Sequence, residues 1–361
     1  MRSFAKINLG LRIGQTRADG FHELLTVYQT IAWHDIIKVS VERGRGIEIR
    51  CADPRVPSGE SNTCYRMAEL AMNALRAKAK VVIEIKKRLP VQAGLGGASA
   101  NAVSVLLGIE RALKKTLPAA RRLCIASEVG SDVPLFLVGG TVLGVGRGEQ
   151  VYPVEDLPAI ACVVVTPEIG VSTPKAFAEW DRLCRAGKLA GQAVTVGDSA
   201  RAAAITKRLR PAWTNECSPP HTSGSLINRP KLTLVKPSDR MIELGRAYSA
   251  WLSLPYSGAP LVDSKRSRAE NPLLALVRAG IMNDFEQVVF PEYPELCKAK
   301  RALERSGARY ASLSGSGSSL YGLFDSRQDA ALASAKLRSQ GWAAQATETV
   351  TRRQYWKRLF V

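Results

Sequence analysis

Histidine is scarce in this chain: only His22, His34 and His221 occur among its 361 residues. Histidine is the usual base of Ser-His-Asp hydrolases and a common ligand of hydrolytic zinc, so the sequence offers few candidate residues for either class of enzyme. The seven cysteines are odd in number and widely spaced, and no C-x-x-C pair occurs. This pattern argues against a disulfide framework and against a zinc site.

Long apolar runs are also missing. No uninterrupted apolar stretch reaches the roughly 18 residues that a membrane-spanning helix needs. The start, Met1 to Asn8, is too polar for a signal peptide. We therefore expect a cytoplasmic protein without a membrane partner. Hydrophobic residues at 46% and charged residues at 23% are typical of a globular chain, and the length allows about two domains.

Acidic residues are in the minority, since 51 Lys and Arg against 32 Asp and Glu give a formal charge of +19. Such an excess raises the possibility of nucleic-acid binding, but a positive field equally suits an enzyme that handles phosphorylated or nucleotide substrates. Part of the excess is concentrated in residues 181–270, with 15 Lys and Arg against 7 Asp and Glu. Because no basic stripe interleaved with aromatic residues is present, we expect no nucleic-acid partner.

Hydrophobic periodicity predicts a mixed α/β chain. The expected strands are residues 5–13, 36–41, 47–50, 81–85, 160–166, 310–313, 320–324 and 343–350, with a glycine-rich hairpin at 139–148. The expected helices are residues 61–77, about 98–115, 271–290, 292–306 and 329–340. Residues 189–269 show only short apolar runs and scattered basic residues, so we expect an irregular basic insertion between an N-terminal domain, 1–188, and a C-terminal domain, 270–361.

The most informative segment is a first glycine loop, residues 90–97, which joins a predicted strand to a predicted helix. Glycines allow close backbone approach, and the unpaired N–H groups of a helix N-terminus form a phosphate cradle. The loop is not a Walker A motif, because no Gly-Lys-Ser/Thr follows, and Ser99 stands where a Rossmann fingerprint needs its third glycine. The alternative is a tight turn that simply requires positive φ angles.

This loop resembles the phosphate-binding motif of the GHMP kinases, Pro-x-x-x-Gly-Leu-Gly-Gly/Ser-x-Ser-Ser, with Ala100 standing where a second Ser is usual. The resemblance implies that the protein binds ATP together with Mg²⁺. The implied ATP-binding residues are Pro90, Val91, Gln92, Ala93, Gly94, Leu95, Gly96, Gly97, Ala98, Ser99 and Ala100. The protein ligands of Mg²⁺ stay unassigned, with Ser99 as the one candidate.

Lys6 and Asp132 each have an ordinary structural explanation, a strand lysine with its amine in solvent and an aspartate that caps a helix. Together, Ala-Lys-Ile-Asn-Leu at residues 5–9 and Gly-Ser-Asp-Val-Pro at residues 130–134 resemble the diphosphocytidyl-methylerythritol kinases, a family of GHMP kinases. The resemblance implies a catalytic pair. Asp132 would accept or orient the proton of the substrate hydroxyl, while Lys6 would stabilise the developing alkoxide and bridge to phosphate.

A second glycine loop, residues 314–319, resembles the third GHMP motif, which packs beside the first loop. Its implied functional residues are Gly315, Ser316 and Gly317. On composition alone the segment could equally be a flexible Ser-Gly turn. Arg147 and Lys175 are candidate additional cations for the phosphate charge.

Residues 19–29 indicate which molecule accepts the phosphoryl group. They look like the Asp-Gly-Tyr-His-x-Leu-x-Thr-Val-Phe-Gln stretch of the same kinases, and we call the part of the site that binds this molecule the acceptor side. The resemblance implies that Phe21, in place of the usual Tyr, stacks on cytosine and that His22 hydrogen-bonds the base edge. A second element at residues 171–177 implies that Phe177 covers the other face of the base. Alternatives are a core aromatic for Phe177 and a structural turn contact for His22. The implied substrate-binding residues are Asn8, Phe21, His22, Thr173 and Phe177.

The resemblance implies a two-domain α/β fold, with an N-terminal domain like the second domain of ribosomal protein S5 and a ferredoxin-like C-terminal domain. It implies ATP-dependent phosphorylation of the 2-hydroxyl of 4-diphosphocytidyl-2-C-methyl-D-erythritol, hereafter CDP-methylerythritol, in the non-mevalonate (MEP) isoprenoid pathway, by a monomer or homodimer. The alternatives are another GHMP kinase, such as homoserine kinase, and a basic RNA-binding protein on an S5-like fold.

Overall fold

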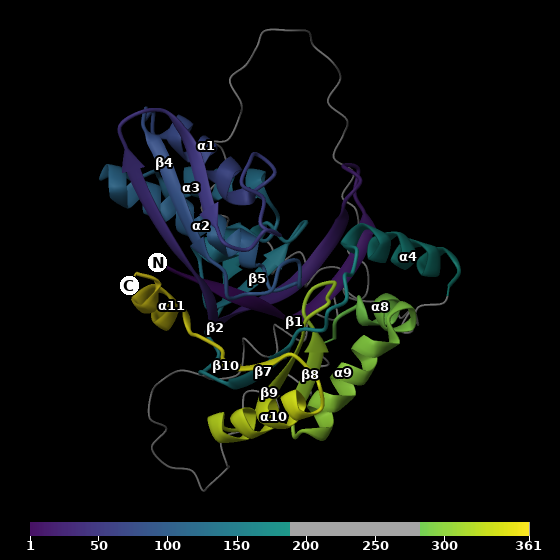
Figure 1. Cartoon of the computed structure of the whole chain (residues 1–361). Helices are drawn as coiled ribbons and strands as arrows, with labels where there is room; N and C mark the ends of the chain where they lie inside the picture. The colour runs from purple at the N-terminus through teal and green to yellow at the C-terminus, as the bar shows by residue number, and fades with distance from the viewer. Residues whose placement is uncertain (188–281, 361) are drawn as a thin grey trace, which may run out of the picture.

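The computed structural model describes residues 1–187 and 282–360 (Figure 1). The expected insertion at 189–269 lies outside the described residues. Two sheets organise the described part of the chain, one in each half of the view, and the N- and C-terminal ends lie close together beside helix α11 (Figure 1). The expectation of a two-domain α/β fold is confirmed.

The first sheet, as far as the described ranges show, has six strands in the order β3-β4-β2-β5-β6, with β1 paired to β2. Its strands are β1 (Arg2–Thr16), β2 (His22–Glu42), β3 (Gly46–Cys51), β4 (Lys80–Lys86), β5 (Thr141–Val145) and β6 (Gln150–Pro153). Helices α1 (Thr63–Ala74), α2 (Gly97–Leu113) and α3 (Ala119–Val129) pack with this sheet around one apolar core, and the 3₁₀ helix η1 (Pro134–Leu137) follows.

The second sheet is antiparallel, in the order β10-β7-β9-β8. Its strands are β7 (Ala161–Val165), β8 (Tyr310–Leu313), β9 (Leu320–Phe324) and β10 (Ala344–Glu348). The accompanying helices are α4 (Thr173–Arg185), α8 (Glu286–Glu292), α9 (Pro294–Arg305) and α10 (Arg327–Ser339). The C-terminal helix α11 (Arg352–Leu359) instead packs into the core of the first sheet. Strand β7 falls within the expected first domain but pairs with strands of the second sheet, so the chain enters the second region well before residue 188.

The long hairpin of β1 and β2 spans both regions (Figure 1). Successive side chains of a strand point to opposite faces, so the alternation in β1 separates two sets of residues. Ile7 and Leu9 lie in an apolar cluster with Val164 and Tyr321 of the second sheet. Lys6 and Asn8, which alternate with these apolar residues, therefore project to the other face of the strand.

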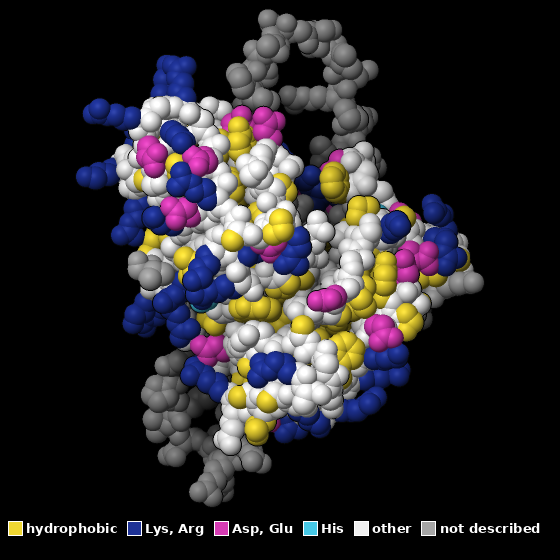
Figure 2. All heavy atoms as spheres, viewed as in Figure 1, with side chains coloured by type: hydrophobic (Ala, Val, Ile, Leu, Met, Phe, Trp, Pro, Cys, Tyr) yellow, Lys and Arg dark blue, Asp and Glu magenta, His cyan; other side chains and the backbone are white. Residues whose placement is uncertain are grey.

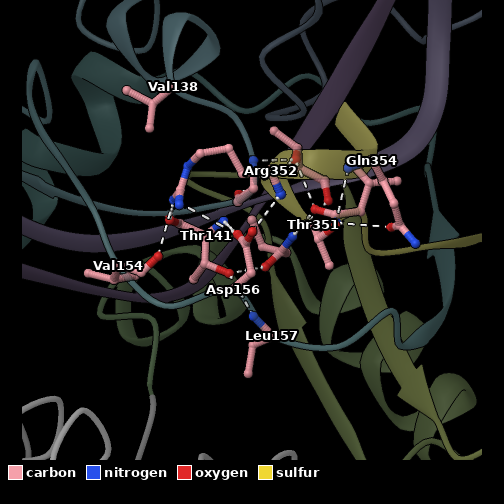
Figure 3. A network of polar contacts seen from close by, with 12 residues as sticks. Val138, Thr141, Val154, Asp156, Leu157, Thr351, Arg352 and Gln354 are labelled. Carbon is pink, nitrogen blue, oxygen red and sulfur yellow. Dashed lines mark hydrogen bonds and ion pairs between the residues drawn. The ribbon is translucent and has the colours of Figure 1, made fainter. Parts of the chain in front are cut away.

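Helix α11 is tied to the first sheet by the Asp156–Arg352 network (Figure 3). The Asp156 carboxylate accepts hydrogen bonds from the backbone N–H groups of Thr141, at 3.0 Å, and Arg352, at 2.7 Å. In return, the Arg352 guanidinium donates to the carbonyl oxygens of Thr141, at 2.8 Å, and Val154, at 3.1 Å. Almost every partner in this network is a backbone atom, so it fixes the position of the C-terminal helix.

Most expected elements are confirmed. Among the elements that were not expected are helices α3 and α11 and the first part of β2, residues 22–35. The expected helix at 271–290 is confirmed from Glu286, where α8 begins, to residue 290, but residues 282–285 form a bridge and a turn. The reason is that Asn283 and Asp284 use their side chains in tertiary contacts: the Asn283 amide donates to Leu313 O, and the Asp284 carboxylate pairs with Arg12 at 3.0 Å.

Cys51, Cys64, Cys162 and Cys297 are free thiols, whereas Cys124 is disulfide-bonded, so the prediction that the cysteines form no disulfides does not hold for that residue. Lys and Arg side chains are scattered over both regions among Asp and Glu on the face shown in Figure 2, instead of forming one stripe.

No helix in the described ranges combines the length and apolarity that spanning a bilayer requires.

Candidate functional site

A cavity of about 330 Å³ opens where the first glycine loop enters α2. All of residues 90–99 line it, whereas Ala100 is buried on α2, being 2% exposed. The cavity therefore collects ten of the eleven residues expected to bind ATP. With no acidic residue in the first turn of α2, the positive end of the helix is left for an anion.

The glycines of this loop are required by close contacts as well as by backbone conformation. Gly94 has φ +76°, and a Cβ there would lie 2.4 Å from the carbonyl oxygen of Ser314 in the second glycine loop. Gly96 has φ +67°, and a Cβ there would lie 2.9 Å from Cγ of Lys6. The loop is thus shaped by the second loop on one side and by the expected catalytic lysine on the other.

The wall of the cavity includes residues that sequence reasoning missed. Lys87 places its Nζ atom 2.6 Å from Oδ2 of the fully buried Asp35. The Asp35 carboxylate also accepts from the backbone N–H of Leu89 and from the side-chain amide of Asn101. The carbonyl oxygen of Asn101 has no hydrogen-bond partner within the described residues. The end of β4 and the start of α2 are thereby held together at the phosphate cradle.

Asn62 and Cys64 line the same cavity from the start of α1. Asn62 caps this helix, because its side-chain oxygen accepts from the Cys64 N–H at 2.9 Å. Burial raises the pKa of the Cys64 thiol to about 12, so it stays neutral. A cap of the type Asn-Thr-Cys is common in helices, and it carries no signal of a nucleotide site.

Lys6 and Asp132 meet, although 126 positions separate them in the sequence. Lys6 Nζ lies 3.2 Å from Asp132 Oδ2, and the lysine is 3% exposed against 34% for the aspartate side chain. The ammonium also donates to Oδ1 of Asn8 at 2.7 Å, and the Asn8 amide donates to Thr26 at 2.8 Å. The lysine is fixed in place, while the carboxylate stays partly open to a ligand.

Tyr28 was missed by the sequence analysis, and it contacts the same carboxylate. Its hydroxyl donates to Asp132 Oδ1 at 3.0 Å. Burial and the nearby carboxylate raise the pKa of Tyr28 well above its usual value, so the hydroxyl remains a donor. Two glycines make room for it, since a Cβ at Gly144 or Gly148 would lie 2.5 or 2.4 Å from Tyr28 atoms. Tyr28 lies inside the motif at residues 19–29, which was the one available signal.

The two glycine loops lie in contact. The Ser314 hydroxyl donates to the Gly94 carbonyl at 3.0 Å, and the Ser319 N–H donates to Ala93 O at 3.1 Å. A Cβ at Gly315 would lie 3.5 Å from Nζ of Lys6. One glycine of each loop, Gly96 in the first and Gly315 in the second, therefore lies next to the Lys6 side chain.

The residues expected on the acceptor side are only partly brought together. The rings of His22 and Phe177 stack with centroids 4.6 Å apart, and Phe177 meets Phe285 edge-on at 5.0 Å. Phe21 is 51% exposed in the loop between β1 and β2. Arg147, a candidate phosphate cation, instead places its guanidinium 4.8 Å from the centre of the Phe21 ring.

Helix α4 links the acceptor side to the second glycine loop. The hydroxyl of Thr173, at the start of the helix, lies 2.7 Å from the hydroxyl of Ser316. Lys175 is exposed on the same turn. In the residues that the structure describes, no group of three or more His, Cys, Asp or Glu side chains could hold a metal ion.

Comparison with known proteins agrees with this arrangement. The family model for the GHMP kinases N terminal domain matches residues 62–140, and the model for the GHMP kinases C terminal matches residues 269–342. A 4-diphosphocytidyl-2-C-methyl-D-erythritol kinase of Solibacter usitatus is 34% identical over 327 residues, covering 91% of this chain and 81% of the relative. The kinase of the same name from Acaryochloris marina is 31% identical over 340 residues, covering 94% and 91%.

Solved structures show the same fold. A crystal structure of 4-(cytidine 5'-diphospho)-2C-methyl-D-erythritol kinase has a TM-score of 0.64 at 24% identity, covering 97% of this chain and 98% of that one. A homoserine kinase from Cytophaga hutchinsonii has a TM-score of 0.60 at 17% identity, covering 96% and 95%. The fold is therefore shared with kinases of other acceptors, and the sequence relatives are what separate them. By these relatives, the chain belongs to the 4-diphosphocytidyl-2-C-methyl-D-erythritol kinase family of the GHMP kinases.

Proposed function

We propose that this protein transfers the γ-phosphoryl group of ATP to the 2-hydroxyl of CDP-methylerythritol, the MEP-pathway reaction. The observation that carries the proposal is the contact of Lys6 with Asp132 at 3.2 Å, directly beside the glycine loop that lines the cavity at the start of α2. The family relationship supports the choice of acceptor.

In the proposed reaction, the acceptor oxygen attacks the γ-phosphorus while the bond from that phosphorus to the β–γ bridging oxygen breaks, releasing ADP. Asp132 takes the proton of the attacking hydroxyl, and its 34% exposure gives the hydroxyl access. Lys6 stabilises the charge that develops on the oxygen and on the phosphoryl group. Because Asn8 holds the ammonium at 2.7 Å, little reorganisation is needed during the reaction.

The phosphates of ATP bind at the first glycine loop, where the N–H groups at the start of α2 and the ammonium of Lys87 supply positive potential. Mg²⁺ bound with ATP neutralises phosphate charge. The Ser99 hydroxyl, which lines the cavity, is the protein group that would hold this Mg²⁺.

The cytidine arm lies, in this proposal, at the hairpin loop of β1 and β2, where Phe21 offers an exposed ring face and His22 a ring edge. Phe177 and Thr173 come from the facing helix α4. Thr173 contacts Ser316 of the second glycine loop. The proposed cytidine site and the proposed phosphate site are therefore connected through this contact.

ATP consumption measured in parallel with CDP-methylerythritol, homoserine, mevalonate and galactose tests this function. We expect turnover with the cytidine compound alone. Consumption with homoserine but not with CDP-methylerythritol would overturn the substrate assignment. Salt-sensitive RNA binding without any ATP turnover would overturn the kinase assignment itself.

A further inference from the structure

Asp181 lies on α4 one turn after Phe177, and its carboxylate reaches the ring of His22. Oδ1 of Asp181 is 2.8 Å from Nε2 of His22, whose side chain is 7% exposed. Residues four apart on a helix share a face, so α4 presents an aromatic ring and a carboxylate to the same histidine. The ring stacks on the imidazole, and the carboxylate contacts its edge.

This contact determines where a neutral His22 carries its proton. An ionised carboxylate only accepts hydrogen bonds, so Nε2 must be the donor. The hydroxyl of Thr16, 3.4 Å from the same nitrogen, is compatible with that assignment because it too can accept. With the proton on Nε2, the Nδ1 atom carries a lone pair and acts as an acceptor.

The Nδ1 atom is available to a ligand. It makes no hydrogen bond within the described part of the chain. It also keeps contact with solvent, because the fully buried side-chain atoms without a hydrogen-bond partner do not include it. Phe177 covers a face of the imidazole rather than this edge. A neutral His22 therefore offers Nδ1 as one acceptor of fixed polarity.

We propose that Asp181 is a positioning residue that makes His22 select cytosine over uracil. The 4-amino group of cytosine donates a hydrogen bond, which matches the Nδ1 lone pair. Uracil has a carbonyl oxygen at the same ring position, and its lone pairs would face that of Nδ1. This inference rests on the proposed function, which places the cytidine arm at His22. One mismatched hydrogen bond of this kind corresponds to a loss of binding affinity on the order of 10- to 100-fold for uracil relative to cytosine.

The substitution Asp181→Asn tests the inference. The asparagine amide can donate as well as accept, so His22 can adopt its other tautomer and present an N–H to uracil. Affinities for CDP and UDP are measured by calorimetry, and kcat/KM is measured with CDP-methylerythritol and its uridine analogue. We expect the wild-type preference for cytidine to fall about tenfold or more. Asp181→Glu, which retains an acceptor-only group, should retain more of the preference.

Glu179→Gln is the matched control. It removes the same charge from the same helix, but Glu179 pairs with Arg182 at 2.6 Å. The control should leave the ratio of CDP to UDP affinity unchanged.

Two results would overturn the inference: wild-type protein that does not prefer CDP to UDP, or an Asp181→Asn protein that loses affinity for both equally. The latter would assign Asp181 a structural role. If wild type prefers CDP, Asp181→Asn loses that preference, and CDP-methylerythritol is nevertheless not phosphorylated, the inference stands and the proposed function fails.

Discussion

Two charged networks join distant parts of this chain, and they differ in what their charged groups contact. In the Lys6–Asp132 pair the polar neighbours are side chains, Asn8 for the lysine and Tyr28 for the aspartate. The Asp132 side chain keeps 34% of its surface exposed. The pair is held firmly from within the protein, but it has not used all of its hydrogen-bonding capacity.

In the Asp156–Arg352 network the partners are mainly backbone N–H and carbonyl groups, and they connect α11 to the strand β5 and the segment after β6 (Figure 3). Backbone groups cannot be released without disturbing the fold. The comparison teaches that the pair suited to chemistry is positioned by neighbouring side chains, whereas the pair that serves the fold is positioned mainly by main-chain groups. Four predictions test this distinction.

The largest effect is expected for Asp132→Asn and Lys6→Ala. Turnover should fall by about 10³-fold or more, because the amide cannot take the proton and the alanine cannot stabilise the alkoxide. ATP affinity, measured by calorimetry, should survive, since neither side chain lines the cavity. Asp325→Asn, which breaks an exposed pair with Arg309, is the control and should retain full activity. Substantial residual turnover would remove the substituted residue from the mechanism.

Asp156→Ala should show the opposite behaviour. The substitution leaves the N–H groups of Thr141 and Arg352 without their acceptor, so the free energy of unfolding should fall by about 2–4 kcal/mol. Urea denaturation measures this loss, and kcat per folded molecule should stay within about twofold of wild type. A stable variant with lowered kcat would erase the distinction between the two networks.

Gly94→Ala should separate the two glycine loops. The added Cβ would lie 2.4 Å from Ser314 O, at a residue whose φ of +76° already disfavours a side chain. We expect ATP affinity to fall by about tenfold or more, because the phosphate cradle must shift. Gly170→Ala is the control, since nothing lies within 4 Å of its added Cβ. Unchanged ATP binding in Gly94→Ala would show that the loop tolerates displacement.

The smallest effect is expected for Tyr28→Phe, which keeps the ring and removes only the hydroxyl that donates to Asp132 at 3.0 Å. With one carboxylate oxygen released, kcat should fall by roughly 3- to 10-fold while KM for both substrates stays within about twofold. Steady-state kinetics provide the test. If kcat holds while thermal stability drops, Tyr28 serves packing alone.

The local parts of the site were predictable because short-range sequence encodes them. A strand, three close glycines and a helix define the first glycine loop at residues 90–97, and ten of the eleven residues expected to bind ATP, 90–100, line one cavity. The role of the individual residues at the catalytic centre stays a prediction. So does the division of the chain at residue 188.

Other features had no local signal. Asp181 contacts His22 across 159 positions of sequence, and Tyr28 contacts Asp132 across 104. Within the helix expected at 271–290, residues 282–285 are not helical for a related reason. Asn283 donates to Leu313 O across 30 positions, and no pattern within the segment reveals that partner.

The sequence by itself determined the family, the glycine loops and the alternation that puts Lys6 on one face of β1 and Ile7 on the other. These follow from motifs, backbone freedom and strand periodicity, which operate over a few residues. Only the tertiary structure decided which donors hold each carboxylate. Such contacts depend on distances between elements far apart in the chain, and those distances are fixed by the packing of the two sheets around the β1–β2 hairpin.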